Sequence, residues 1–104
     1  MVVVDVERRI QFINSQTERL FGFKRGELIG SEIEILIPER YREQHPEKFA
    51  GFVRDAHARP MATGLRLFGQ RKDGSEFPVE ISLSPVQTDD GMLVSAAIRD
   101  VTER

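Results

Sequence analysis

The 104-residue sequence contains neither cysteine nor tryptophan. Without cysteine the chain can form no disulfide, no cysteine-ligated zinc or iron–sulfur site and no thiol nucleophile. The same absence excludes a covalent flavin, and any other photochemistry that needs a bond between a chromophore and a cysteine. Because tryptophan is missing as well, nothing in the sequence specifically indicates a flavin.

Long apolar runs and an excess of one charge are also missing. The longest apolar runs, among them Val2–Val4 and Ile35–Ile37, fall far short of the roughly 18 residues that cross a bilayer. The first residues show no charged-then-apolar signal pattern, so we expect a cytoplasmic location and no membrane contact. Fifteen basic and seventeen acidic residues are mixed along the chain and give a net charge of −2. This balance argues against non-specific nucleic-acid binding.

Catalytic motifs are absent too. The sequence has no Walker loop, no GxSxG, no HExxH and no phosphoacceptor-histidine helix pattern. A serine triad needs a histidine base, but His45 and His57 are expected near helix ends without a nucleophile motif. Glu32 and Glu34 are two residues apart, which places them on different helix faces rather than together. We therefore expect no metal site and no enzymatic activity, with a small enzyme as the alternative that a turnover assay would test.

At 11.9 kDa the chain has room for one domain with one core. Within it, strand signals occur at both ends of the sequence. Two short strands, Val2–Val4 and Ile10–Ile13, flank a polar turn. Near the C-terminus, alternating apolar residues and two Asp-Gly pairs predict an antiparallel meander joined at Gly74 and Gly91. Its three strands are expected at residues 64–71, 76–87 and 92–101.

The middle of the chain is predicted to be helical and interrupted. Ser15, with Glu18 three residues later, fits a capping box, and Asn14 is also expected in a capping role. The longest helix is expected from about Pro46 to Ala56, because its apolar residues follow the three-and-four spacing of one buried stripe.

Four motifs, in order and on this pattern of elements, resemble those of the PAS domain family. They are Ile13–Phe23 (INSQTERLFGF), Glu27–Gly30 (ELIG), Arg71–Glu80 (RKDGSEFPVE) and Asp100–Arg104 (DVTER). The resemblance implies an α+β PAS fold, with a five-stranded antiparallel sheet in the order 2-1-5-4-3. Short helices and one longer helix would cover one face. It also implies that residues 1–104 are a single PAS domain and a fragment, with an N-terminal lead-in and a C-terminal output domain outside this sequence.

PAS domains often hold a cofactor or small molecule between the longer helix and the sheet. An apolar lining would suit an apolar ligand, such as a fatty acyl chain, although a plain packed core needs the same residues. The expected lining residues are Leu36, Phe49, Phe52, Val53, Leu67, Val79, Ile81, Leu83, Val94, Ala96 and Ile98.

Haem is the most specific cofactor that the resemblance suggests. The segment Ile37–His45 resembles the stretch before the proximal histidine of oxygen-sensing PAS domains. Two departures argue against haem: Pro46 follows the histidine directly, and Leu65 stands where those sensors use a distal arginine. Since proline biases the preceding residue away from helical geometry, we expect His45 in the turn before the helix with its ring in water. We therefore predict that the chain binds no haem.

The resemblance predicts a sensory and interaction module that regulates an attached histidine kinase, cyclic-dinucleotide enzyme or transcription regulator. The alternative is a ligand-free dimerisation module with no sensing of its own. Asp100 and Thr102 would tether the sheet to an emerging signalling helix, although both also suit a plain polar strand end. By alternation, Leu93, Ala97 and Val101 should face away from the helices and form the surface of a weak homodimer.

Overall fold

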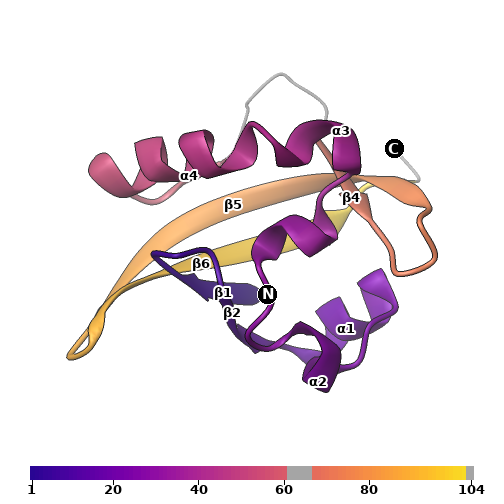
Figure 1. The fold of residues 1–104 in the computed structure, drawn as a ribbon, viewed down its shortest axis with the longest axis horizontal. Coiled ribbons are helices and arrows are strands. Elements are labelled where there is room, and N and C mark those ends of the chain that lie inside the picture. The colour runs from indigo at the N-terminus through magenta and orange to yellow at the C-terminus, as the bar shows by residue number, and fades with distance from the viewer. Residues whose placement is uncertain (61–66, 103–104) are drawn as a thin grey trace.

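The computed structural model describes residues 1–60 and 67–102, and within them one antiparallel sheet runs through the molecule (Figure 1). The strand order is β2-β1-β6-β5, and the free edge of β5 pairs with β4 and, further along, with the two-residue β3. Without β3, the order in chain numbering is 2-1-5-4-3, as predicted. The strands are β1 (Val2–Asp5), β2 (Ile10–Ile13), β3 (Arg59–Pro60), β4 (Leu67–Gln70), β5 (Glu76–Thr88) and β6 (Gly91–Asp100).

Helical segments occupy the stretch between β2 and β3. The helices α3 and α4 lie along β5, whereas α1 and α2 lie beside β1 and β2 (Figure 1). The longest described helix is α4, as the apolar spacing predicts. The segments are α1 (Ser15–Phe21), α2 (Arg25–Leu28), the 3-10 turn η1 (Ile33–Leu36), α3 (Glu39–Arg42) and α4 (His45–Arg54).

The predicted meander is confirmed in the described residues. The strands β4 and β5 pair antiparallel, as do β5 and β6. Gly74 and Gly91, at the two connections, have φ angles of 90° and 121°, which favour glycine because it has no Cβ. Residues 64–66, the predicted start of the first of these strands, lie outside the described residues.

The N-cap of α1 differs from the capping-box prediction. Ser15 is the first helical residue, and Asn14 is the cap: its Oδ1 accepts hydrogen bonds from the backbone N–H and the hydroxyl of Thr17, at 3.1 and 2.6 Å. Glu18 does not close a capping box but forms an ion pair with Arg25 at 3.4 Å. Asn14 takes the cap because the extended backbone of β2 continues into it, with φ −86° and ψ 164°.

The inner face of the sheet and the helices share one apolar core. The strands contribute residues at alternate positions, as their period of two requires. The buried apolar residues are Val2, Val4, Ile10, Ile13, Phe21, Leu28, Leu36, Phe49, Phe52, Phe77, Val79 and Val94.

Candidate functional site

A cavity of about 320 Å³ lies between the helical segments and the inner face of the sheet. Its volume is at the lower end of the range for small-molecule pockets, roughly 300–1,000 Å³. Most of its wall is apolar. The lining residues are Val4, Phe21, Ile33, Leu36, Ile37, Tyr41, His45, Lys48, Phe49, Phe52, Leu67, Phe68, Gly69, Val79, Ile81, Leu83, Val94, Ala96 and Ile98.

The structure brings ten of the eleven predicted lining residues together in this wall. The exception is Val53, which packs partly buried against the core. Sequence reasoning missed Val4 and Phe21, because pairing of β1 with β6 and the position of α1 bring them to the cavity. It also missed Tyr41, His45 and Lys48, which supply ionisable groups to an otherwise apolar wall.

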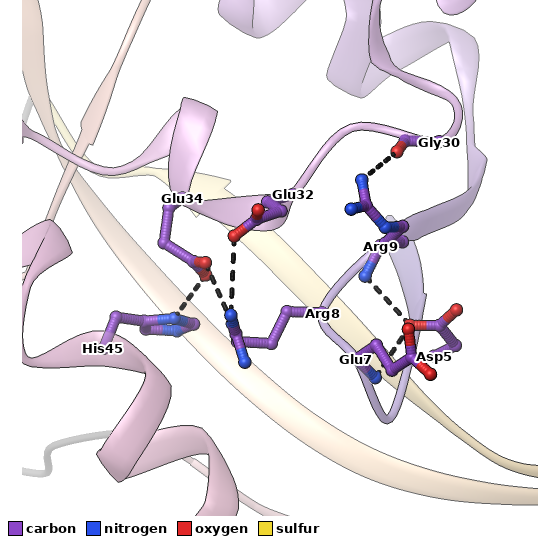
Figure 2. Close-up of polar contacts among 8 residues, drawn as sticks. All are labelled: Asp5, Glu7, Arg8, Arg9, Gly30, Glu32, Glu34 and His45. Carbon is purple, nitrogen blue, oxygen red and sulfur yellow. Dashed lines mark hydrogen bonds and ion pairs between the residues drawn. The ribbon is translucent and has the colours of Figure 1, made fainter.

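His45 does not lie in a solvated turn, so the sequence-based prediction for this residue is wrong. It is the first residue of α4, followed by Pro46, and only 18% of its side chain is exposed. Its Nδ1 lies 2.7 Å from Oε2 of Glu34 (Figure 2), and its ring lies 6.1 Å from that of Phe49. These contacts hold the ring inside despite the preference that proline imposes on the preceding residue.

The carboxylate that holds His45 is itself held by an arginine. The Nε of Arg8 donates to Oε1 of Glu34 at 2.9 Å, and its Nη2 donates to Glu32 at 3.4 Å (Figure 2). The expectation that Glu32 and Glu34 point apart is therefore wrong. Glu32 precedes the 3-10 turn in extended conformation, so helical spacing does not apply to the pair. Arg8 has a φ of 70° in the turn between β1 and β2.

Burial sets the charge of His45. It lowers the pKa of the imidazole, whereas the neighbouring Glu34 raises it, and Arg8 and Lys48 lower it further. The pKa therefore falls below its ordinary value of 6.5, and the ring is neutral at neutral pH. The hydrogen bonds that Arg8 donates to Glu34 and Glu32 raise the pKa of its guanidinium, which is always charged.

Arg40 on α3 connects that helix to the hairpin of β4 and β5 beside the cavity wall. The guanidinium of Arg40 forms an ion pair with Glu76 at 2.5 Å. The same group lies over the rings of Tyr41 and Phe68, at 4.6 and 5.7 Å. Because Tyr41 and Phe68 both line the cavity, these contacts connect α3 to the sheet across its wall.

The residues predicted to transmit a signal lie together at the end of β6. Asp100 accepts hydrogen bonds from the backbone N–H of Thr102, at 2.8 Å, and from its hydroxyl. The hydroxyl bond is the main cause that lowers the pKa of Asp100, and Arg71 also contributes from 3.8 Å. The geometry is a local turn at the end of β6, and Arg71 links it to the connection between β4 and β5.

Along β6, the residues predicted for the outer face alternate with residues that line the cavity. Leu93 pairs with Val86 and Ala97 pairs with Ser82 across the β5–β6 ladder, on the face opposite to Val94, Ala96 and Ile98. Val101 follows β6, and its N–H donates to the carbonyl of Pro78 at 3.1 Å.

The described part of the chain holds neither a metal-binding cluster nor a membrane-spanning helix. Residues 1–60 and 67–102 contain no group of three or more metal-ligating side chains placed to share an ion. No helix within these residues has the length and apolar character to cross a membrane. Leu65, which stands where oxygen-sensing PAS domains use a distal arginine, lies outside the described residues.

Comparison with known proteins gives one consistent family. A model of the family described as PAS domain matches residues 1–103. Sensor protein FixL of Bradyrhizobium diazoefficiens is 31% identical over 103 residues, 99% of this chain and 20% of that protein. Oxygen sensor protein DosP of Escherichia coli is 32% identical over 101 residues, 97% of this chain and 13% of that protein. The chain thus spans a fifth or less of these two relatives.

A solved structure supports the fold independently. The PAS domain of an HTR-like protein from Haloarcula marismortui superimposes with a TM-score of 0.78 at 22% sequence identity. The match covers 96% of this chain and 78% of that one. At this identity the similarity establishes the fold alone.

Proposed function

The chain belongs to the PAS domain family, and from that premise we propose that it senses a small, mainly apolar molecule held in the cavity between its helices and sheet. The observation that carries this proposal is the cavity itself. Its sheet-side wall is formed by apolar residues such as Val79, Val94 and Ile98, and its helix side includes Phe49 and Phe52. Such a wall favours an apolar body, since each Å² removed from water contributes about 25 cal/mol.

The sensing proposal is tested by the occupancy of the cavity. We expect the purified chain to release a bound small molecule on solvent extraction, or to bind p-xylene saturably by NMR titration. Ala96→Leu places a larger side chain in the cavity wall and should abolish p-xylene binding. Ala97→Leu, on the opposite face of β6, is the matched control and should preserve it. An absence of saturable binding in the unaltered chain would contradict the proposal.

The attached output is the second part of the proposal. The chain regulates a histidine kinase, a cyclic-dinucleotide enzyme or a transcription regulator in the same polypeptide, as a sensory PAS module of a larger signalling protein. The small share of FixL and DosP that it matches supports this proposal. Asp100 and Thr102 would connect the sheet to that output, and the outer sheet face around Leu93 and Ala97 would pair with a second copy. Without a ligand, the chain would act as a dimerisation module alone.

Haem-based oxygen sensing is the second candidate function, and the position of His45 favours it. The prediction against haem rested on a solvated ring and on Leu65 in place of a distal arginine. The first of these fails, because His45 lines the cavity with Nδ1 on a carboxylate. This arrangement is common in metal-ligating histidines, because it orients the other ring nitrogen and increases its basicity. His45 would hold the iron, Phe49 and the sheet residues would enclose the macrocycle, and bound haem would supply reversible binding of oxygen. The relative DosP is by its name an oxygen sensor protein.

Spectroscopy after haem reconstitution tests this candidate. A stoichiometric Soret band that His45→Ala removes would support it, and His57→Ala is the control because His57 lies outside the cavity. A spectrum that is the same in wild type and His45→Ala would contradict binding of the iron by His45.

A further inference from the structure

The imidazole of His45 presents one unused polar atom to the cavity. Its Nδ1 is bonded to Glu34, a residue outside the cavity wall, whereas His45 itself lies in that wall. Its Nε2 has no hydrogen-bond partner among residues 1–60 and 67–102. With Nδ1 turned toward Glu34, this geometry leaves the opposite edge of the ring, which carries Nε2, for the cavity side of His45.

The contacts of Glu34 decide which ring nitrogen carries the proton. Glu34 accepts from Arg8 through Oε1 and is ion-paired with it, so its other oxygen faces His45 as a carboxylate oxygen. Since a carboxylate oxygen can only accept a hydrogen bond, Nδ1 must donate. In the neutral ring the lone pair then belongs to Nε2. Burial of the ring, together with the charges of Arg8 and Lys48, keeps it neutral against the opposing effect of Glu34.

The other polar groups of the wall differ from Nε2 in their access to water. Tyr41 is 41% exposed and Lys48 is exposed, so both can hydrate their polar ends when the cavity is filled. Nε2 belongs to a side chain that is only 18% exposed. A ligand that displaces water from the cavity without replacing the hydrogen bond of that water would leave Nε2 as a buried, unpaired acceptor, which weakens binding.

We propose that the cavity selects apolar molecules that carry one hydrogen-bond donor, such as phenols or alcohols, and that this donor binds Nε2 of His45. The inference rests on the proposed function, since it specifies the chemistry of the same ligand. An ether or ketone oxygen next to Nε2 would direct its lone pair at the lone pair of Nε2, so the two atoms would repel each other. The hydroxyl hydrogen of a phenol instead completes a chain of hydrogen bonds from the ligand through His45 and Glu34 to Arg8.

Two isomeric probes separate the contribution of the hydrogen-bond donor to binding from that of the apolar part of the ligand. 4-Ethylphenol and 4-methylanisole have the same atoms, but only the phenol can donate. By calorimetric or NMR titration we expect the phenol to bind about tenfold more tightly, the equivalent of one hydrogen bond. In His45→Leu the two affinities should become equal within about twofold, whereas His57→Leu should retain the wild-type ratio.

Glu34→Gln is the most direct test, because it preserves the shape of the side chain and replaces one carboxylate oxygen with an amide nitrogen. Arg8 requires an acceptor, so the amide oxygen takes its side and the amide nitrogen faces His45. Nδ1 then accepts, the proton moves to Nε2, and the cavity presents a donor. The preference should reverse toward an acceptor probe, 4-methylbenzaldehyde, and the ¹⁵N chemical shifts of the His45 ring should show the exchange of tautomer directly.

The outcomes distinguish this inference from the proposed function. Equal binding of both isomers by the wild type would overturn donor selection and leave an apolar ligand in the cavity. A protonated Nε2 in the free wild-type protein, seen in the same ¹⁵N spectra, would also overturn it. If neither isomer binds and p-xylene fails as well, the sensing function is overturned together with the inference.

Discussion

At the scale of single residues, His45 makes the stability of the protein depend on pH. Its folded-state pKa lies below the ordinary value of 6.5 because of burial. Above that value the ring is neutral in both states and contributes no pH dependence. As the pH falls through 6.5, the unfolded chain takes up the proton more readily, so the free energy of unfolding falls until the folded pKa is passed. For one proton the slope cannot exceed about 1.4 kcal/mol per pH unit.

Urea unfolding of wild type and His45→Gln between pH 5.5 and 7.5 measures this contribution. We expect the free energy of unfolding of the wild type to exceed that of His45→Gln by a smaller amount as the pH is lowered. His57→Gln, in which an exposed histidine is replaced, should follow the wild-type curve. Parallel curves for wild type and His45→Gln would contradict the prediction.

Asn14 is the second residue with an effect of its own. It caps α1 and also accepts the hydroxyl of Thr17, whose side chain is 1% exposed. Asn14→Ala should lower the free energy of unfolding by about 0.5–2 kcal/mol, as measured in chemical denaturation. Ser15→Ala changes the exposed first residue of the helix and should have an effect of a few tenths of a kcal/mol. A larger loss in Ser15→Ala would restore Ser15 as the cap.

At the scale of elements, Gly69 permits α1 to pack closely on β4. A Cβ at this position would lie 2.9 Å from Cε1 of Phe21 and 3.2 Å from the ring of Phe77. The two rings already pack edge-to-face with centroids 5.2 Å apart. Gly69→Ala should therefore force the Phe21 ring outward and lower the free energy of unfolding by about 1–3 kcal/mol.

Gly51→Ala, inside α4, is the matched control for this packing argument. Its added Cβ would approach only Nη2 of Arg54, at 3.8 Å, an ordinary contact. The substitution should raise the free energy of unfolding by about 0.5–1 kcal/mol, because alanine favours a helix interior more than glycine does. Opposite signs for the two substitutions in the same urea experiment are the expected result, and equal losses would contradict it.

At the scale of the whole molecule, the outer face of the sheet remains open to a partner. Leu93 and Ala97 lie on it, and Val86, which pairs with Leu93, is 41% exposed. We expect weak self-association through this face, seen as a concentration-dependent sedimentation coefficient. Ala97→Glu should weaken it by placing like charges opposite each other at the interface. Ile29→Glu, at an exposed apolar residue near α2, should leave it unchanged.

A monomer at all concentrations, in this chain and in a longer one with its flanking segments, would contradict dimerisation through the sheet. It would leave the cavity as the functional feature of the chain. Association that survives Ala97→Glu would place the interface elsewhere on the surface.

The sequence alone determined the framework of this protein. Alternation along β5 and the Asp-Gly turns specified the meander, because side chains in a strand alternate with a period of two and Asp-Gly suits a hairpin turn. Ten of the residues that line the cavity were also predicted, from strand alternation for Val79 and Ile98, from the apolar stripe of α4 for Phe49 and Phe52, and from the resemblance to PAS domains. These features are local, since each depends on residues a few positions apart.

Only the tertiary structure decided the polar centre of the site. Arg8, Glu34 and His45 are separated by 26 and 11 residues, and their contacts exist only after β1, η1 and α4 pack around the same core. The local preference before Pro46 indicated a solvated histidine, but the bond to Glu34 and the contact with Phe49 hold the ring inside. A local rule describes the unfolded chain's bias at one residue, whereas the position of a side chain in the fold follows from contacts between segments distant in sequence. The apolar pattern could thus be predicted from the sequence, and the buried position of the His45 ring could not.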